Sequence, residues 1–141
     1  MAEFNFPTEE IELPSKGLVY PKEHPLSSGK VEMKYMTAKE EDILSNQSYI
    51  QKGTVLDKLL QSLIISKGVK VDDLIVGDKN ALLIASRILG YGKDYEFEYN
   101  GIEHKFDLTE LKPVNIDFSK LIRGKNEFKF KLPTSEREVK F

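Results

Sequence analysis

Side chains that could perform chemistry are few and widely spaced in this sequence. His24 lies among prolines and His104 lies in an alternating aromatic segment, and these are the two histidines. There is no cysteine, and neither histidine has a partner at metal-ligand spacing, so a zinc site is not expected. The segment 90–93, Gly-Tyr-Gly-Lys, lacks the spacing of a phosphate-binding loop, and no serine has the glycine neighbours of a nucleophile elbow. The sequence therefore predicts a protein that is not an enzyme and uses no metal or cofactor.

Three adjacent carboxylates at positions 40–42 form the densest acidic cluster. They follow Thr37, and Thr37 and Glu40 have the spacing of a capping box, in which each side chain can bind a free backbone N–H of a first helical turn. Carboxylates at that place also meet the positive end of the helix dipole. A helix start explains the cluster better than a metal or acid–base site does.

A nucleic-acid interface is a weaker alternative. Phe128 and Phe130 alternate with Lys129 and Lys131, which resembles a stacking platform with basic neighbours. Alternation in a strand, however, places the aromatic and basic side chains on opposite faces. The net charge of −2 also gives no general attraction to nucleic acid.

Composition is typical of one soluble domain. The 141 residues are 40% hydrophobic and 31% charged, which is enough apolar content for a core. No apolar run approaches the roughly 20 residues of a membrane span, and residues 1–4 do not begin a signal peptide. We expect a cytoplasmic protein.

The first 30 residues hold four of the six prolines and predict an extended arm with turns. This arm either wraps its own domain or lies on a neighbouring subunit. Residues 31–141 are expected to form a single domain.

Helices are predicted at residues 37–47, 54–66 and 79–89. The second has apolar residues at i, i+3, i+4, i+7 and i+8, which gives an amphipathic stripe beginning at Leu56. The third is apolar on nearly every face, with Arg87 as its strong charge, so we expect it to be central and buried. Asp78 is the expected N-cap of this third helix.

Alternating segments predict strands. One runs from residue 30 to residue 36 with Val31, Met33 and Tyr35 on one side. Asn100-Gly101 predicts a tight hairpin over residues 94–107, in which Phe97 faces His104 and Glu98 faces Glu103. That pair of like charges would be repulsive, which suggests positive charge from another strand or a partner.

A second hairpin is expected over residues 126–141, with Phe130 facing Val139 and Phe128 facing Phe141. The expected fold class is therefore α+β, with about three helices packed against antiparallel hairpins and an extended N-terminal arm. The last strand would be an open edge, suited to strand addition by a partner.

Three segments, taken together, resemble a known family. They are Leu-Pro-Ser-Lys-Gly-Leu-Val-Tyr-Pro at 13–21, Met-Thr-Ala-Lys-Glu-Glu-Asp-Ile-Leu at 36–44, and Leu-Ile-Val-Gly-Asp-Lys-Asn at 74–80. Their order and wording resemble the small baseplate hub and hub-assembly proteins of T-even-type, contractile-tailed bacteriophages. The resemblance extends over residues 11–95 and more faintly over 128–141.

The resemblance implies a nonenzymatic structural or assembly role in the tail baseplate, through contacts with other tail proteins. Such a late protein would occur in the host cytoplasm during assembly, and in the virion tail if it is retained. A transient chaperone that binds the tape-measure protein is the alternative function. The partners expected from the resemblance are other tail and baseplate proteins, with the tape-measure protein and further copies of the chain as additional candidates.

Two segments are the predicted partner contacts: the arm loop and the edge of the last hairpin. The residues are Leu13, Pro14, Lys16, Gly17, Leu18, Val19, Tyr20, Pro21, Phe128, Phe130, Val139 and Phe141.

Overall fold

Alternation in the segment beginning at Lys30 produces the first β-hairpin of the protein. The computed structural model, which describes residues 7–141, shows strand β2 (Lys30–Lys34) with Val31 and Met33 buried. β2 pairs antiparallel with β1 (Thr8–Glu12), and Ile11 lies opposite Val31. The arm thus contributes a strand to the sheet of its own domain.

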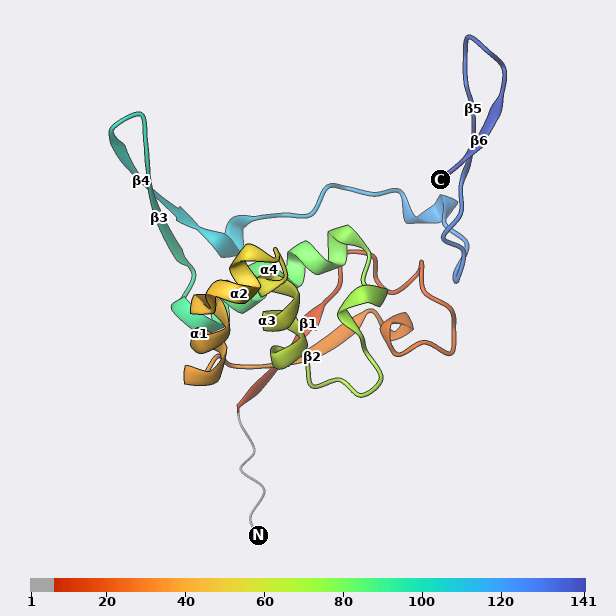
Figure 1. The fold of residues 1–141 in the computed structure, drawn as a ribbon. Helices are drawn as coiled ribbons and strands as arrows, with labels where there is room; N and C mark the ends of the chain where they lie inside the picture. The colour runs from red at the N-terminus through yellow and green to blue at the C-terminus, as the bar shows by residue number, and fades with distance from the viewer. Residues whose placement is uncertain (1–6) are drawn as a thin grey trace.

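Four α-helices pack with this hairpin (Figure 1). They are α1 (Ala38–Ser45), α2 (Gln47–Gln51), α3 (Val55–Leu63) and α4 (Val76–Tyr91). The helix predicted at 37–47 ends early because Asn46 adopts an extended conformation. Its side chain instead accepts a hydrogen bond from the Tyr49 N–H and caps α2. Short 3-10 turns, η1 (Pro25–Ser28) and η2 (Val71–Asp73), complete the body, which we define as residues 8–91.

The buried apolar core of the described chain lies within the body. The arm supplies Leu13, Tyr20 and Leu26, so the described part of the arm wraps its own domain. The first six residues of the arm lie outside the described residues. The remaining core residues come from β2, α3, η2, α4 and the turn before α4: Val31, Met33, Leu59, Leu60, Leu63, Val71, Leu74 and Leu82.

Two further hairpins project from opposite ends of the body (Figure 1). The first joins β3 (Asp94–Tyr99) to β4 (Ile102–Asp107), and the second joins β5 (Lys129–Lys131) to β6 (Glu138–Lys140). Asn100 and Gly101 both have positive φ, as the predicted two-residue turn requires.

The predicted register of both hairpins is confirmed. Phe97 faces His104, and Glu98 faces Glu103. Phe130 faces Val139, and the backbones of Phe128 and Phe141 exchange hydrogen bonds of 2.9 and 3.0 Å. The α+β class is also confirmed, but these two hairpins differ from the expectation in one respect: their strands are almost wholly exposed and add no residue to the described core.

Helix α4 corrects two expectations. Its N-cap is Ile75, and Asp78 lies inside the first turn with its side chain fully buried. The buried carboxylate of Asp78 is stabilised by hydrogen bonds that Ser15 and Tyr20 of the arm donate to it. The helix is also not buried all round, since Val76 is 75% exposed and its buried residues are Asp78, Leu82 and Ser86.

Glu40 is the second fully buried carboxylate of the body. It accepts hydrogen bonds from Lys34 (2.7 Å), Ser62 (2.5 Å) and the N–H and hydroxyl of Thr37 (2.9 and 2.6 Å). The Thr37 N–H thus donates to Glu40 as the capping box predicts, and the same carboxylate joins β2 and α3 to α1. Burial alone would raise the pKa of the Glu40 carboxyl, but these hydrogen bonds outweigh burial and lower the pKa to about 2.

Acid should therefore weaken the body through Glu40. Because its folded-state pKa is lowered from 4.5 to about 2, its stabilisation is complete above the unfolded pKa and is lost as the pH falls through the folded pKa. We expect this group alone to remove up to about 3 kcal/mol of unfolding free energy across that window. Urea unfolding at a series of pH values measures the effect. Glu40→Gln should flatten the pH dependence, and an unchanged slope in that variant would contradict the assignment.

Candidate protein-interaction surface

The structure divides the predicted contact loop into buried and accessible side chains. Leu13 and Tyr20 are only 2% and 5% exposed, and Gly17 is buried as well. This is a correction, because Leu13 and Tyr20 pack in the chain's own core and Gly17 is buried against backbone atoms, so the three are not available to a partner. The half-buried or exposed members of the loop are Pro14, Lys16, Leu18, Val19 and Pro21.

Asp78 fixes this loop to helix α4. One carboxylate oxygen accepts the Ser15 N–H at 3.0 Å, and the other accepts the Ser15 and Tyr20 hydroxyls, both at 2.6 Å. The Tyr20 oxygen in turn accepts the Ile75 N–H at 3.1 Å, immediately before the helix. Burial, together with the hydrogen bond to Asp78, raises the pKa of the Tyr20 hydroxyl, so this group remains a donor. All of these groups are satisfied internally, which gives them a structural role.

A close backbone approach makes the same loop rigid. Gly17 has a φ of +72°, and a Cβ built on it would lie 2.5 Å from the Ser27 carbonyl oxygen and 2.6 Å from the Gly29 nitrogen. Only glycine combines this left-handed conformation with so little space. The loop therefore holds one shape against the turn at 26–29.

The segment that joins the two projecting hairpins crosses the body as a strap, which we define as residues 108–124. It begins where Leu108 N–H donates to the Lys93 carbonyl at 2.8 Å. It ends where Gly124 N–H donates to the Leu18 carbonyl at 2.7 Å. Lys16 also lies 4.5 Å from the ring centroid of Phe118, a cation–π contact between the predicted loop and the strap.

Asp107 sets the start of the strap. Its carboxylate accepts hydrogen bonds from Lys93 at 2.7 Å and from the Thr109 N–H at 2.9 Å. The bond from Lys93, and after it those from Thr109, lower the pKa of Asp107 to about 2. The Thr109 bond also caps the 3-10 turn η3 (Leu108–Glu110), so the chain leaves β4 in a defined direction.

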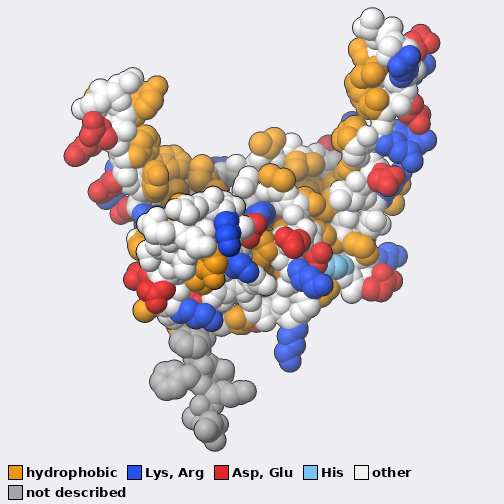
Figure 2. All heavy atoms as spheres, viewed as in Figure 1, with side chains coloured by type: hydrophobic (Ala, Val, Ile, Leu, Met, Phe, Trp, Pro, Cys, Tyr) orange, Lys and Arg blue, Asp and Glu red, His pale blue; other side chains and the backbone are white. Residues whose placement is uncertain are grey.

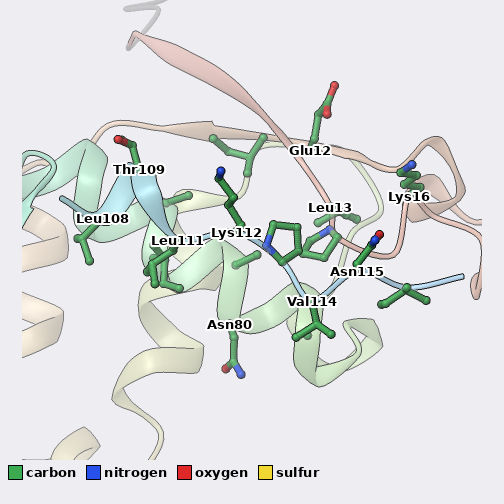
Figure 3. A pocket seen from close by; sticks show the side chains of 18 of the residues that line it. Glu12, Leu13, Lys16, Asn80, Leu108, Thr109, Leu111, Lys112, Val114 and Asn115 are labelled. Carbon is green, nitrogen blue, oxygen red and sulfur yellow. The ribbon is translucent and has the colours of Figure 1, made fainter. Parts of the chain in front are cut away.

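An open groove of about 940 Å³ lies between the strap, helix α4 and the arm loop (Figure 3). Apolar side chains predominate among its lining residues, with Ala81, Ile84 and Ile88 from α4 and Leu111 and Val114 from the strap. Val114 is 85% exposed, so the strap leaves apolar surface facing outward as well. Sequence reasoning missed this groove. The sequence feature that indicates such a groove is the excess of apolar residues in α4, because the core does not bury all of them.

One face of the β3–β4 hairpin is rich in aromatic side chains. Its register places six side chains on one face: Tyr95, Phe97, Tyr99, Ile102, His104 and Phe106. Phe97 and His104 stack with ring centroids 5.3 Å apart, yet Phe97 remains 43% exposed and Tyr99 remains 64% exposed. Arg87 of α4 lies over the rings of Tyr91 and Tyr95 at 4.9 and 5.8 Å and links this face to the body.

The predicted contact residues of the last hairpin are accessible. Phe130 is 53% exposed and Phe141 is 72% exposed, while Val139 is 38% exposed and Phe128 is half-buried. Phe128 and Phe141 stack with centroids 5.8 Å apart. The structure thus leaves these four side chains free for contact, and their binding of a partner stays a prediction.

Within residues 7–141, no cluster of three or more His, Asp or Glu side chains is placed to hold a metal ion. The helices of that same part of the chain are too short or too polar to cross a membrane. Comparison of the chain with family models, curated proteins and solved structures gives no match. The exposed apolar side chains described above lie at three places: the two projecting hairpins and the groove.

Tyr20→Phe should destabilise the body. It removes a hydroxyl that both donates to buried Asp78 and accepts from Ile75, and leaving such groups unsatisfied costs about 1–3 kcal/mol. Urea unfolding measures the loss. Tyr35→Phe is the matched control, because the Tyr35 hydroxyl bonds only to exposed Glu9 and its loss should be nearly neutral. Equal effects of the two changes would contradict the role given to Asp78.

Gly17→Ala should cost more stability than Gly53→Ala. Both glycines have positive φ, so both substitutions incur the strain of a left-handed alanine, roughly 1–2 kcal/mol. A Cβ at Gly53 meets nothing within 4 Å, whereas one at Gly17 meets backbone atoms. Thermal or urea unfolding of the two variants isolates the backbone contact, and a smaller loss for Gly17→Ala would rule it out.

Proposed function

We propose that this chain is a nonenzymatic structural or assembly component of a contractile phage tail baseplate, in the hub region. The observation that carries the protein-binding part of this proposal is the exposure of aromatic side chains on two hairpins that contribute nothing to the described core. Large exposed apolar patches on a folded protein are typical of protein interaction sites. The assignment to a baseplate rests on the resemblance of the segments 13–21, 36–44 and 74–80.

The body and the segments after it have different properties, which fit separate roles as a support and as contact surfaces. The body has its own core and satisfies both of its buried carboxylates, so it can serve as a rigid base. The hairpins and the strap hold exposed apolar residues, among them Tyr99, Val114 and Phe141. A protein that joins several others needs such separate surfaces on one support.

The nucleic-acid alternative is not favoured by the last hairpin. Each lysine of its strands lies near a carboxylate: Lys129 near Glu138 at 2.8 Å, Lys131 near Glu136 at 3.8 Å, and Lys140 near Glu127 at 3.7 Å. Lysines that lie among carboxylates, on the face opposite the aromatic rings, do not form a basic stacking surface.

The combined change Phe130→Ser and Phe141→Ser should weaken binding to baseplate proteins of the same phage at least about tenfold, because loss of exposed aromatic anchors lowers affinity. Co-purification from cells that express the chain with those proteins, followed by titration, measures the loss. Val76→Ser is the control, since Val76 is also apolar and exposed but lies on the body. Undiminished binding by the hairpin variant would count against this contact surface.

Mass spectrometry of purified virions separates the structural role from the chaperone role. A retained hub component should be present in fixed proportion to other baseplate proteins. Presence in the infected-cell lysate together with absence from virions would favour a transient chaperone for the tape-measure protein.

A further inference from the structure

Both projecting hairpins place like charges directly opposite each other. In β3–β4 the pairs are Asp94 with Asp107 and Glu98 with Glu103, whereas in β5–β6 the pair is Lys129 with Lys140. Like charges in such cross-strand positions destabilise a hairpin. The like-charged pairs are therefore acidic in β3–β4 and basic in β5–β6.

Ion pairs within each hairpin relieve this repulsion only in part. In β5–β6, Lys129 lies 2.8 Å from Glu138, whereas Lys131 and Lys140 lie farther from their carboxylates, at 3.8 Å from Glu136 and 3.7 Å from Glu127. Lys105 lies 3.2 Å from Asp94 and 3.4 Å from Glu96, and Lys93 lies 2.7 Å from Asp107. Within residues 7–141, neither Glu98 nor Glu103 has an ion-pair partner. The acidic excess is thus concentrated beside the turn, at the outer end of the β3–β4 hairpin.

The polar faces as wholes are also complementary. That of β3–β4 carries five carboxylates and one lysine, since its paired positions are Asp94, Glu96, Glu98, Glu103, Lys105 and Asp107. That of β5–β6 carries three lysines and one glutamate, at Lys129, Lys131, Glu138 and Lys140. In each hairpin the opposite face is apolar.

Each hairpin also forms a two-stranded sheet of its own, so its outer edges have no strand partner among the described residues. Isolated two-stranded sheets are marginally stable, and added strands stabilise them. Open edges with exposed N–H and C=O groups are suited to strand addition.

We propose that β3–β4 of one copy pairs edge to edge with β5–β6 of a second copy. The resulting four-stranded sheet has one apolar face, and its polar face brings Glu98 and Glu103 near Lys129 and Lys140. This inference deepens the proposed function, because it names a partner for the hairpin surfaces and rests on their role as contact sites.

The positions of the hairpins allow this contact to form twice in a closed dimer. In Figure 1 the hairpins leave opposite ends of the body and point the same way. Figure 2 shows hydrophobic side chains on their inner flanks and charged ones on their outer flanks. A second copy related by a two-fold axis perpendicular to this view places its β5–β6 hairpin beside β3–β4 of the first copy, and its β3–β4 beside β5–β6. The apolar faces of both hairpin pairs then lie on the inside of the dimer. Pairing of like hairpins would instead set acidic against acidic and basic against basic, which disfavours it.

Charge exchange tests the pairing in the full chain. Light scattering at about 100 µM, where even a micromolar contact is populated, should give twice the chain mass of 16.1 kDa. The acidic-hairpin variant Glu98→Lys/Glu103→Lys and the basic-hairpin variant Lys129→Glu/Lys140→Glu should each raise the dimer dissociation constant at least about tenfold. Glu23→Lys/Asp72→Lys, which changes two exposed carboxylates of the body, should leave it unchanged.

Recombination of the variants gives the decisive readout. A mixture of the acidic-hairpin and basic-hairpin variants should form a heterodimer, because both hairpin contacts are then complementary, and the fourfold variant should dimerise alone. A monomeric wild type, or variants that dimerise as well as it does, would overturn the proposed pairing. A monomer that still co-purifies with baseplate proteins would overturn this inference while leaving the proposed function intact.

Discussion

The buried carboxylate of Asp78 holds together the parts of the body on which the remainder depends. A buried carboxylate is costly unless hydrogen bonds satisfy it, and here Ser15 and Tyr20 supply them from more than 55 positions away in the sequence. These bonds fix the arm loop against α4 and thereby set one wall of the groove. They also orient the loop so that Lys16 and Leu18 can hold the far end of the strap. Glu40 makes a comparable connection among β2, α1 and α3.

The body contains the described core, whereas the last third of the chain adds no residue to it. The strap and the two hairpins expose apolar side chains that a self-contained domain would bury, and their polar faces carry opposite charge. The proposed contact with other protein chains would explain both properties. In the proposed function, residues 8–91 are the rigid support and the segments that follow are the recognition surfaces.

Local patterns in the sequence predict the elements well, but long-range contacts are beyond them. Asn100-Gly101 and strict alternation fix the β3–β4 register, because a two-residue turn permits one pairing that puts every apolar residue on one face. Asp78 looks like a helix cap from its neighbours alone, and its actual donors lie in the arm. That the projecting hairpins add no residue to the described core could not be predicted for a similar reason: alternation defines an apolar face but does not identify what covers it.

Amide hydrogen exchange of the chain, free and in assembled baseplates, tests the central claim most directly. If the hairpins are the recognition surfaces, amides of β3–β4 and β5–β6 should become strongly protected on assembly, while those of α3 and α4 change little. Protection confined to the body, with both hairpins exchanging as fast as in the free chain, would contradict the account.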